Sequence, residues 1–255
     1  MMPLDALLSW IVAVLLVGLR VMPVFALAPP FTLAGLPLAL RVAMGLALCG
    51  FIVAGRPELA TVGQMALGAV VETAARELFL GLVFVLALQL VFGALDFAGR
   101  TIDIQAGFGL ATVVDPATQN NAPLIGTLFV YAFAAVFFAM GGQEDLLRIA
   151  AASFDTIPIG HATAPVGLAH LGAFTGAVFT LAMGMAGGAV LCLFVTDMII
   201  AALTRTAPQL NAMVLGFQVK TLVLFLTLPV TFAFAGSILV RLARIALEAL
   251  PELLT

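Results

Sequence analysis

The run VGLAHLGAFTGAVFTLAMGMAGGAVLCLFVT, from Val166 to Thr196, contains no aspartate, glutamate, lysine or arginine. Such a run indicates a membrane helix, because about 20 apolar residues are enough to cross the hydrocarbon core. At about 1.5 Å per residue it would form a helix roughly 45 Å long, well beyond a core of about 30 Å. We therefore expect this helix to tilt, break or leave the membrane.

Five further stretches come close to the same length and composition, and charges or helix-breaking residues separate them. None shows the alternating polarity of a membrane β-strand. We predict an all-α membrane protein with about six long apolar helical segments, some kinked or paired as hairpins, in a single domain over residues 1–255. The further stretches are Ala6–Ala28, Leu36–Ala54, Leu78–Leu95, Ala122–Met140 and Thr221–Val240.

The composition supports this class of protein and excludes others. Hydrophobic residues make up 64% of the chain and charged residues 9%, whereas soluble domains carry about 25% charged residues. The formal net charge is -3 and no lysine or arginine cluster occurs, so a nucleic-acid surface is not expected. Arginines are scattered through nearly every connection, and the positive-inside rule therefore predicts no orientation.

Three charged residues fall inside or beside apolar segments. Arg20 lies well inside the first segment, where an arginine costs about 2.5 to 3.5 kcal/mol on insertion scales, so it should face protein or water. Asp197 and Lys220 could hold a coupling ion in a transporter or simply pair with each other. Of these two interpretations, we favour the structural pair.

The sequence offers little enzymatic chemistry. His161 and His170 form no HExxH motif, and no phosphate-binding GxxxxGK[ST] loop occurs, so we expect no catalytic residue, no metal site and no cofactor. Glu72 and Arg76 stand four residues apart with Glu77 beside them. This spacing favours a helix-stabilising pair at a water-exposed entry to the third apolar segment.

Small residues recur at every fourth position of the opening run: Gly172, Gly176, Thr180, Gly184 and Gly188. Such a row removes side-chain bulk along one stripe of a helix and allows another helix to approach closely. The four glycines are therefore predicted to be helix-packing positions.

Five ordered motifs together resemble the FliR family, which includes the export-gate subunit of virulence injectisomes. The similarity extends over essentially the whole chain, and the segment Asp103–Ala117 resembles the most distinctive loop of the family. In order, the motifs are the set Arg20, Pro23, Pro30 and Arg41, then Asp103–Ala117, Phe154–Gly160, Arg205–Asn211 and Gly216–Phe217.

The resemblance implies a non-enzymatic subunit of the flagellar type III export gate, which helps to form and close the channel for exported flagellar proteins. It implies FliP-like and FliQ-like companion subunits, an FlhB-like switch protein, an FlhA-like export protein and contact with membrane lipid. It also implies a multi-pass protein of the bacterial inner membrane within the flagellar basal body. Three alternatives stay open at this point: an injectisome export-gate subunit, a secondary transporter of a small solute or ion, and a purely structural scaffold.

The resemblance further implies that residues Gln105 to Ala117, here called the channel loop, project into the channel and help to plug it. Gly107 and Gly109 would let the backbone turn sharply, and Asp115–Pro116 would fix the exit from the loop. Apolar side chains between these points would exclude water from a pore. Without the resemblance, an ordinary buried re-entrant loop explains the same residues. The candidate plugging side chains are Phe108, Leu110, Val113 and Val114.

Overall fold

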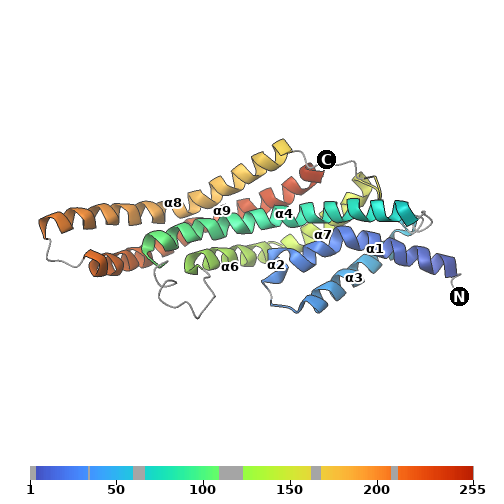
Figure 1. Cartoon of the computed structure of the whole chain (residues 1–255), viewed down its shortest axis with the longest axis horizontal. Coiled ribbons are helices and arrows are strands. Elements are labelled where there is room, and N and C mark those ends of the chain that lie inside the picture. Colours follow the sequence, from blue (N-terminus) through green and yellow to red (C-terminus); the bar gives the residue numbers. More distant parts are fainter. Residues whose placement is uncertain are drawn as a thin grey trace. The chain divides into compact units, whose positions relative to one another are not determined.

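The computed structural model describes residues 4–33, 35–59, 67–108, 123–161, 168–207 and 212–254. Over these residues the elements are helices, and no strand occurs, which confirms the all-α prediction (Figure 1). The helices are α1 (Leu4–Leu27), α2 (Pro29–Thr32), α3 (Leu38–Gly55), α4 (Leu67–Ala106), α6 (Leu124–Ala139), α7 (Gly142–Thr156), α8 (Leu168–Thr206) and α9 (Ala212–Leu254).

The chain divides into two compact units whose segments alternate along the sequence. The first unit consists of Met1–Leu90, Met140–Phe174 and Ile245–Thr255. The second consists of Val91–Ala139 and Thr175–Arg244. The prediction of a single domain over residues 1–255 stays a prediction, and each unit is described by itself.

Among the described residues, five helices are long and apolar enough to cross a membrane, and α6 with α7 forms a sixth candidate that bends by 69°. The predicted segments are therefore present, but the lengths of three were wrong. Helices α4, α8 and α9 contain 40, 39 and 43 residues, which corresponds to about 60 Å each. Over Leu168–Thr206 helix α8 is continuous, so the overlong opening run does not break there.

Helix α4 shows why the predicted segments were too short. It extends beyond Leu78–Leu95 at both ends, into sequence that carries charges. Four of those charges pair along the helix surface, Glu72 with Arg76 and Asp96 with Arg100, and such pairs at four-residue spacing stabilise a helix. Polar residues therefore end the apolar run without ending the helix.

In the first unit, α1 packs along α3, and the short helix α2 lies between them in sequence. Arg41 of α3 fixes the connection, because its guanidinium donates to the carbonyl oxygens of Ala26 at 2.6 Å and Leu36 at 3.1 Å. Most of the outward face of α3 is apolar, including Phe51, whose exposed fraction is 78%.

Also in the first unit, α7 begins directly after Gly141, which adopts a left-handed backbone with φ of 76°. Glu144 and Asp145 form the first turn of α7, and both side chains are exposed. Acidic side chains are favourable there because a helix N-terminus carries partial positive charge. The helix is amphipathic and buries Leu146 and Phe154.

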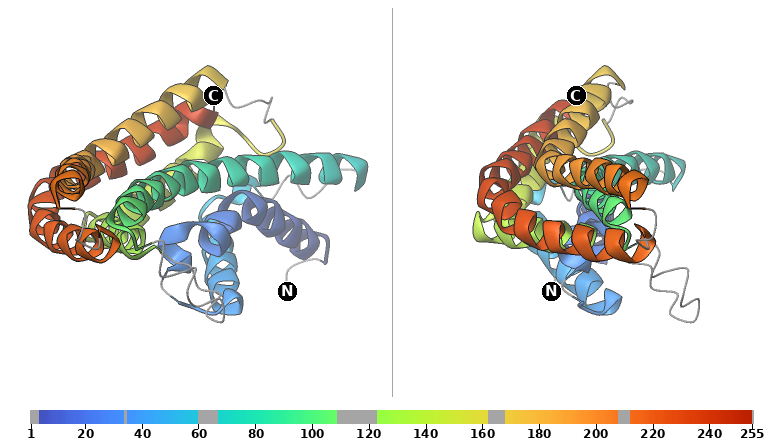
Figure 2. Two further views of the ribbon diagram at one scale, coloured as in Figure 1. Left: turned by 60° about the vertical axis from the view of Figure 1, so that its left-hand side comes forward. Right: turned by 90° about the vertical axis from the view of Figure 1, so that its left-hand side faces the viewer.

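The second unit is held together by aromatic contacts. Phe92 of α4 meets Phe133 of α6 edge-on, with ring centroids 4.8 Å apart. Phe129 of α6 meets Phe232 of α9 at 5.7 Å in a similar arrangement. Helices α8 and α9 run side by side in opposite directions (Figures 1 and 2).

The last turns of α9 are amphipathic. Arg241, Arg244 and Glu248 are exposed. This segment continues α9 without a break. Its apolar face is already buried in the chain, at Leu239, Leu242, Ala246 and Leu250.

Candidate functional site: the Arg20 cluster and the α4–α6 junction

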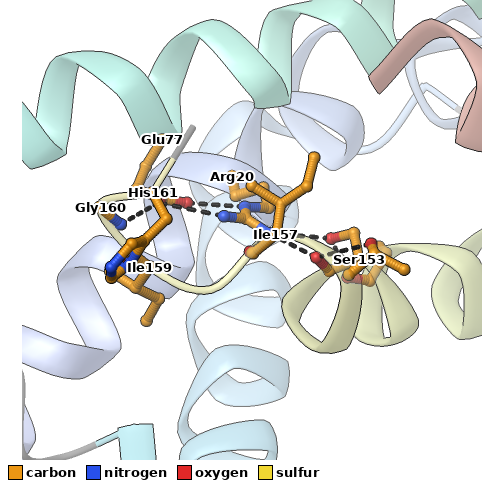
Figure 3. A network of polar contacts seen from close by, with 9 residues as sticks. Arg20, Glu77, Ser153, Ile157, Ile159, Gly160 and His161 are labelled. Carbon is orange, nitrogen blue, oxygen red and sulfur yellow. Dashed lines mark hydrogen bonds and ion pairs between the residues drawn. The ribbon is translucent and has the colours of Figure 1, made fainter. Parts of the chain in front are cut away.

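Arg20 is completely buried in the first unit and forms a bidentate ion pair with Glu77 (Figure 3). Its Nε donates to Glu77 Oε2 at 2.6 Å and its Nη2 donates to Glu77 Oε1 at 3.0 Å. The parallel geometry matches the planar guanidinium fork to the carboxylate, which is the strongest arrangement for such a pair.

The remaining nitrogen of Arg20 binds the end of α7 and the turn that follows. Nη1 donates to the Ser153 carbonyl at 3.0 Å, to Ser153 Oγ at 3.2 Å and to the Ile157 carbonyl at 2.9 Å. The guanidinium carbon lies 4.3 Å from the centre of the Phe154 ring, a cation–π contact. One side chain of α1 thus holds α4 and α7 together.

The turn after α7 is also fixed by Glu77. The amide of Gly160 donates to Glu77 Oε1 at 3.0 Å, and Gly160 has φ of 80°, which is readily adopted only by glycine. Arg76 donates to the Gly160 carbonyl at 3.2 Å and pairs with Glu72 at 2.5 Å. The expected exposed pair of Glu72 and Arg76 is therefore present.

Arg20 faces protein, where it is fully buried. The interpretation of Glu77 as part of a water-exposed entry is wrong, since its side chain is fully buried. A charged guanidinium inside a dry core needs a counter-charge, and Glu77 supplies it.

Asp197 of α8 and Lys220 of α9 pair with each other in the second unit. Lys220 Nζ lies 2.5 Å from Asp197 Oδ1, and the two side chains are 20% and 35% exposed. The geometry is that of an ion pair between neighbouring helices.

Two glycines of the second unit allow α4 and α6 to touch backbone to backbone. A Cβ at Gly99 would lie 2.3 Å from Gly126 Cα, and a Cβ at Gly126 would lie 2.8 Å from Pro123 Cγ. Both distances are far below van der Waals contact, so neither position accepts a side chain. Neither glycine was predicted from the sequence to be a packing position.

Asp103 of α4 caps the N-terminus of α6 at the same junction. Its carboxylate accepts from the Ile125 amide at 3.0 and 3.1 Å and from the Gly126 amide at 3.3 Å. The residue is only 4% exposed. The carboxylate satisfies two amides that have no partner within their own helix and complements the positive end of α6.

Helix α4 ends at the same place in a Schellman motif. Gly107 has φ of 89°, its amide donates to the Ile104 carbonyl at 3.1 Å, and the Phe108 amide donates to the Asp103 carbonyl at 2.9 Å. The backbone turns sharply at Gly107. Gln105, expected at the start of the channel loop, instead lies in the last turn of α4.

The structure locates only part of the predicted plug. Phe108 is half-buried, and its ring lies edge-on to Phe217 of α9 with centroids 6.3 Å apart. The plugging role of the loop stays a prediction. The other predicted positions, Gly109, Leu110, Val113, Val114, Asp115 and Pro116, lie outside the described residues.

The glycine stripe of α8 lies on an exposed face. A Cβ at Gly172, Gly176, Gly184 or Gly188 would meet no atom of the rest of the chain within 4 Å. No helix of this chain therefore uses the stripe for close packing in the described ranges, and its role as a packing surface for another chain stays a prediction. Throughout those ranges, no group of three His, Cys, Asp or Glu side chains could hold a metal ion.

Comparison with known proteins gives consistent similarities. The sequence pattern of the bacterial export proteins, family 1, matches residues 11–245. The flagellar biosynthetic protein FliR of Bacillus subtilis is 28% identical over 98% of this chain and 98% of its own length. FliR of Escherichia coli is 25% identical over 82% of this chain and 80% of its own length. The secretion system apparatus protein SsaT of Salmonella typhimurium is 26% identical over 62% of this chain and 62% of its own length.

Proposed function

The chain belongs to the bacterial export proteins, family 1, and from this membership we infer that it is a subunit of the flagellar type III protein export gate. It is a multi-pass membrane protein of the type III export apparatus. The observation that carries the flagellar assignment is the similarity to FliR of Bacillus subtilis from end to end of both chains. The similarity to the secretion system apparatus protein SsaT covers 62% of this chain, which favours flagellar over injectisome service.

We propose that the subunit acts without catalysis, in the bacterial inner membrane, as part of a helical assembly with FliP-like and FliQ-like subunits. Two features of the chain support assembly with other helices. Helices of about 60 Å exceed the hydrocarbon thickness, and long exposed apolar faces on α8 and α9 need cover from water. The exposed residues of these faces include Leu191, Phe194, Met198, Phe225, Leu226 and Phe234.

An FlhB-like switch protein and an FlhA-like export protein are the further proposed partners, and unfolded flagellar proteins are the proposed cargo. These assignments rest on the family. The exposed charged residues Glu144, Asp145 and Arg148 of α7 are compatible with a position in water beside the membrane. At such a position these two partners would contact the gate.

The channel loop is the proposed plug. Its described beginning supports this proposal, because the Schellman motif turns the chain away from α4 at Gly107. Phe108 follows directly and gives the loop an aromatic side chain at its first position after the turn. Apolar side chains in a narrow pore would prevent ion leak by excluding water.

The transporter alternative is not favoured. It was motivated by Arg20, Asp197 and Lys220, and each of these side chains is engaged in an ion pair. A transporter needs an ionisable group that binds and releases its coupling ion, and these three satisfy each other or Glu77 instead.

Deletion of the chain from its own bacterium tests the proposal. We expect flagellar proteins to disappear from the culture medium while remaining present inside the cell, and expression of the intact chain in trans to restore their export. Export of an unrelated protein through the general secretory route serves as the control. Undiminished export of flagellar proteins without the chain would contradict the proposed function.

A further inference from the structure

We propose that the outward face of α3 contacts the acyl chains of the membrane lipids and is not covered by a helix of another subunit. The inference rests on the proposed function and deepens it, because it separates a surface turned to lipid from the surfaces turned to partner subunits. The outward face consists of the exposed residues Leu40, Ala43, Met44, Leu46, Ala47 and Phe51.

The length of α3 matches the hydrocarbon core of a bilayer. Its 18 residues correspond to about 27 Å, and the core is about 30 Å thick. Helices α4, α8 and α9 are about twice as long and must extend beyond the core wherever they cross it. Helix α3 can therefore lie almost entirely within the hydrocarbon.

Charged residues stand only at the two ends of α3. Arg41 lies in its first turn and Arg56 directly follows its last residue, and the sequence between them carries no charge. Arg41 donates to two backbone carbonyls of the connection before α3, and Arg56 pairs with Asp155. Long basic side chains near the ends of a membrane helix reach the interface with water. Both arginines therefore suit the two surfaces of the hydrocarbon core.

The outward face is wider than one partner helix would cover. With about 100° between successive residues, Leu46 and Met44 bound an arc of about 160° that includes Phe51. A helix commonly buries a stripe about 100° wide against its neighbours, so part of this arc would stay uncovered. Lipid chains adapt to the whole arc. The buried residues of α3 lie on its other side, at Gly45, Cys49 and Val53.

The side chains that protrude from this face are large. Phe51 is 78% exposed and Met44 is 52% exposed, whereas closely packed membrane helices meet at small residues. Ala43 and Ala47 are small and lie one turn apart, but Phe51 continues the same row one turn later. A helix that followed the two alanines would meet the phenylalanine ring. Bulk at this position favours lipid as the neighbour.

Nitroxide labels test the proposal in the purified gate complex, reconstituted into vesicles of phosphatidylethanolamine and phosphatidylglycerol. Met44→Cys and Phe51→Cys place a label at two points of the outward face. Both are made with Cys192→Ser, because Cys192 is exposed whereas Cys49 is buried. The control Arg148→Cys places a label on the exposed, charged side of α7 in the same unit.

Electron paramagnetic resonance measures how strongly each label is relaxed by dissolved oxygen and by a water-soluble nickel complex. Oxygen concentrates in hydrocarbon, and the charged or polar nickel complex is excluded from it. We therefore expect the ratio of oxygen to nickel accessibility at Met44→Cys and Phe51→Cys to be several-fold higher than at Arg148→Cys.

Two other results at the outward face would overturn the inference. A label shielded from both reagents would show that a partner protein covers α3. A label relaxed mainly by the nickel complex would place the face in water. If Met44→Cys does not assemble, Phe51→Cys decides, and failure of both to assemble would show that partner subunits need this face.

The double variant Ala43→Leu/Ala47→Leu provides an independent test without a label. A lipid-facing helix accepts larger apolar side chains, so partner subunits should co-purify as with the unchanged chain. Loss of these partners from a folded chain would overturn the inference. Absence of partners from the unchanged chain would instead contradict the proposed function, and the labels in the reconstituted chain alone would still decide whether α3 faces lipid.

Discussion

Replacement of Arg20 and Glu77 by methionine, singly and together, tests how the first unit is held together. Either single replacement leaves one buried charge without its counter-charge. Breaking a buried pair in this way costs about 3–5 kcal/mol, because an uncompensated charge stays inside the protein. For Glu77→Met the loss of stability should be near the upper limit of this range. In that variant Arg20 keeps its charge, and only the Ser153 and Ile157 oxygens remain as its acceptors.

The double replacement should behave differently. It removes both charges together, and exchange of a whole buried pair for apolar residues of similar size is often neutral. We therefore expect the double variant to be more stable than either single variant. The Ser153 and Ile157 carbonyls lose their donor in this variant, so some destabilisation should remain.

Thermal unfolding of the detergent-solubilised protein measures these differences. For a chain of this size 1 kcal/mol corresponds to about 2–4 °C, so each single variant should unfold roughly 6–20 °C lower. Glu72→Gln, which breaks the exposed pair with Arg76, is the matched control and should shift the midpoint by less than about 4 °C. A double variant whose shift equals the sum of the two single shifts would refute the reasoning.

Three further predictions follow from the second unit and the stripe. Gly126→Ala should destabilise the chain by about 1–3 kcal/mol through overpacking, as measured by thermal unfolding. The control Gly187→Ala should not destabilise it, because a Cβ at Gly187 meets nothing within 4 Å. Gly176→Leu and Gly184→Leu should leave the isolated chain folded but prevent assembly, and normal co-purification of partner subunits would contradict this. Lys220→Met should cost about 1 kcal/mol or less, because the Asp197 pair is partly exposed; a loss as large as that of Arg20→Met would refute this estimate.

The five helices that are long enough to cross a membrane were predictable because each contains a long apolar run, whereas the four-residue α2 and the amphipathic α7 contain none. The ends of these helices were not predictable from hydropathy. Helix α4, for example, begins at Leu67, whereas its predicted apolar segment begins only at Leu78. Of the charged residues between these positions, Glu72 and Arg76 pair along the helix surface, and hydropathy registers such residues as the end of a segment. Local pairing at four-residue spacing is therefore a better guide to helix ends in this chain than polarity.

The partners of the buried acids Glu77 and Asp103 could not be predicted from the sequence. Their partners lie 57 and 22 residues away, at Arg20 and Ile125, so no local pattern identifies them. One signal was available: neither acid has a lysine or arginine four residues away, whereas Glu72, Asp96 and Glu144 do. Such an acid beside an apolar run is a candidate for a tertiary contact.

The glycines that permit close helix packing were not those with a regular spacing in the sequence. The stripe of α8 has a regular spacing, but among the described residues Gly99 and Gly126 of the second unit, which belong to no repeat, lie where two backbones come too close for a side chain. Close contact at a single crossing point needs one small residue on each helix. A periodic row is needed only when two helices run together over several turns.

The most direct test of the central claim is a gentle detergent pull-down of the tagged chain from its own bacterium, with mass spectrometry of the proteins that co-purify. We expect a stable complex that contains small helical FliP-like and FliQ-like membrane proteins. A folded, monodisperse chain that brings down no such partner would contradict the assignment to an export gate.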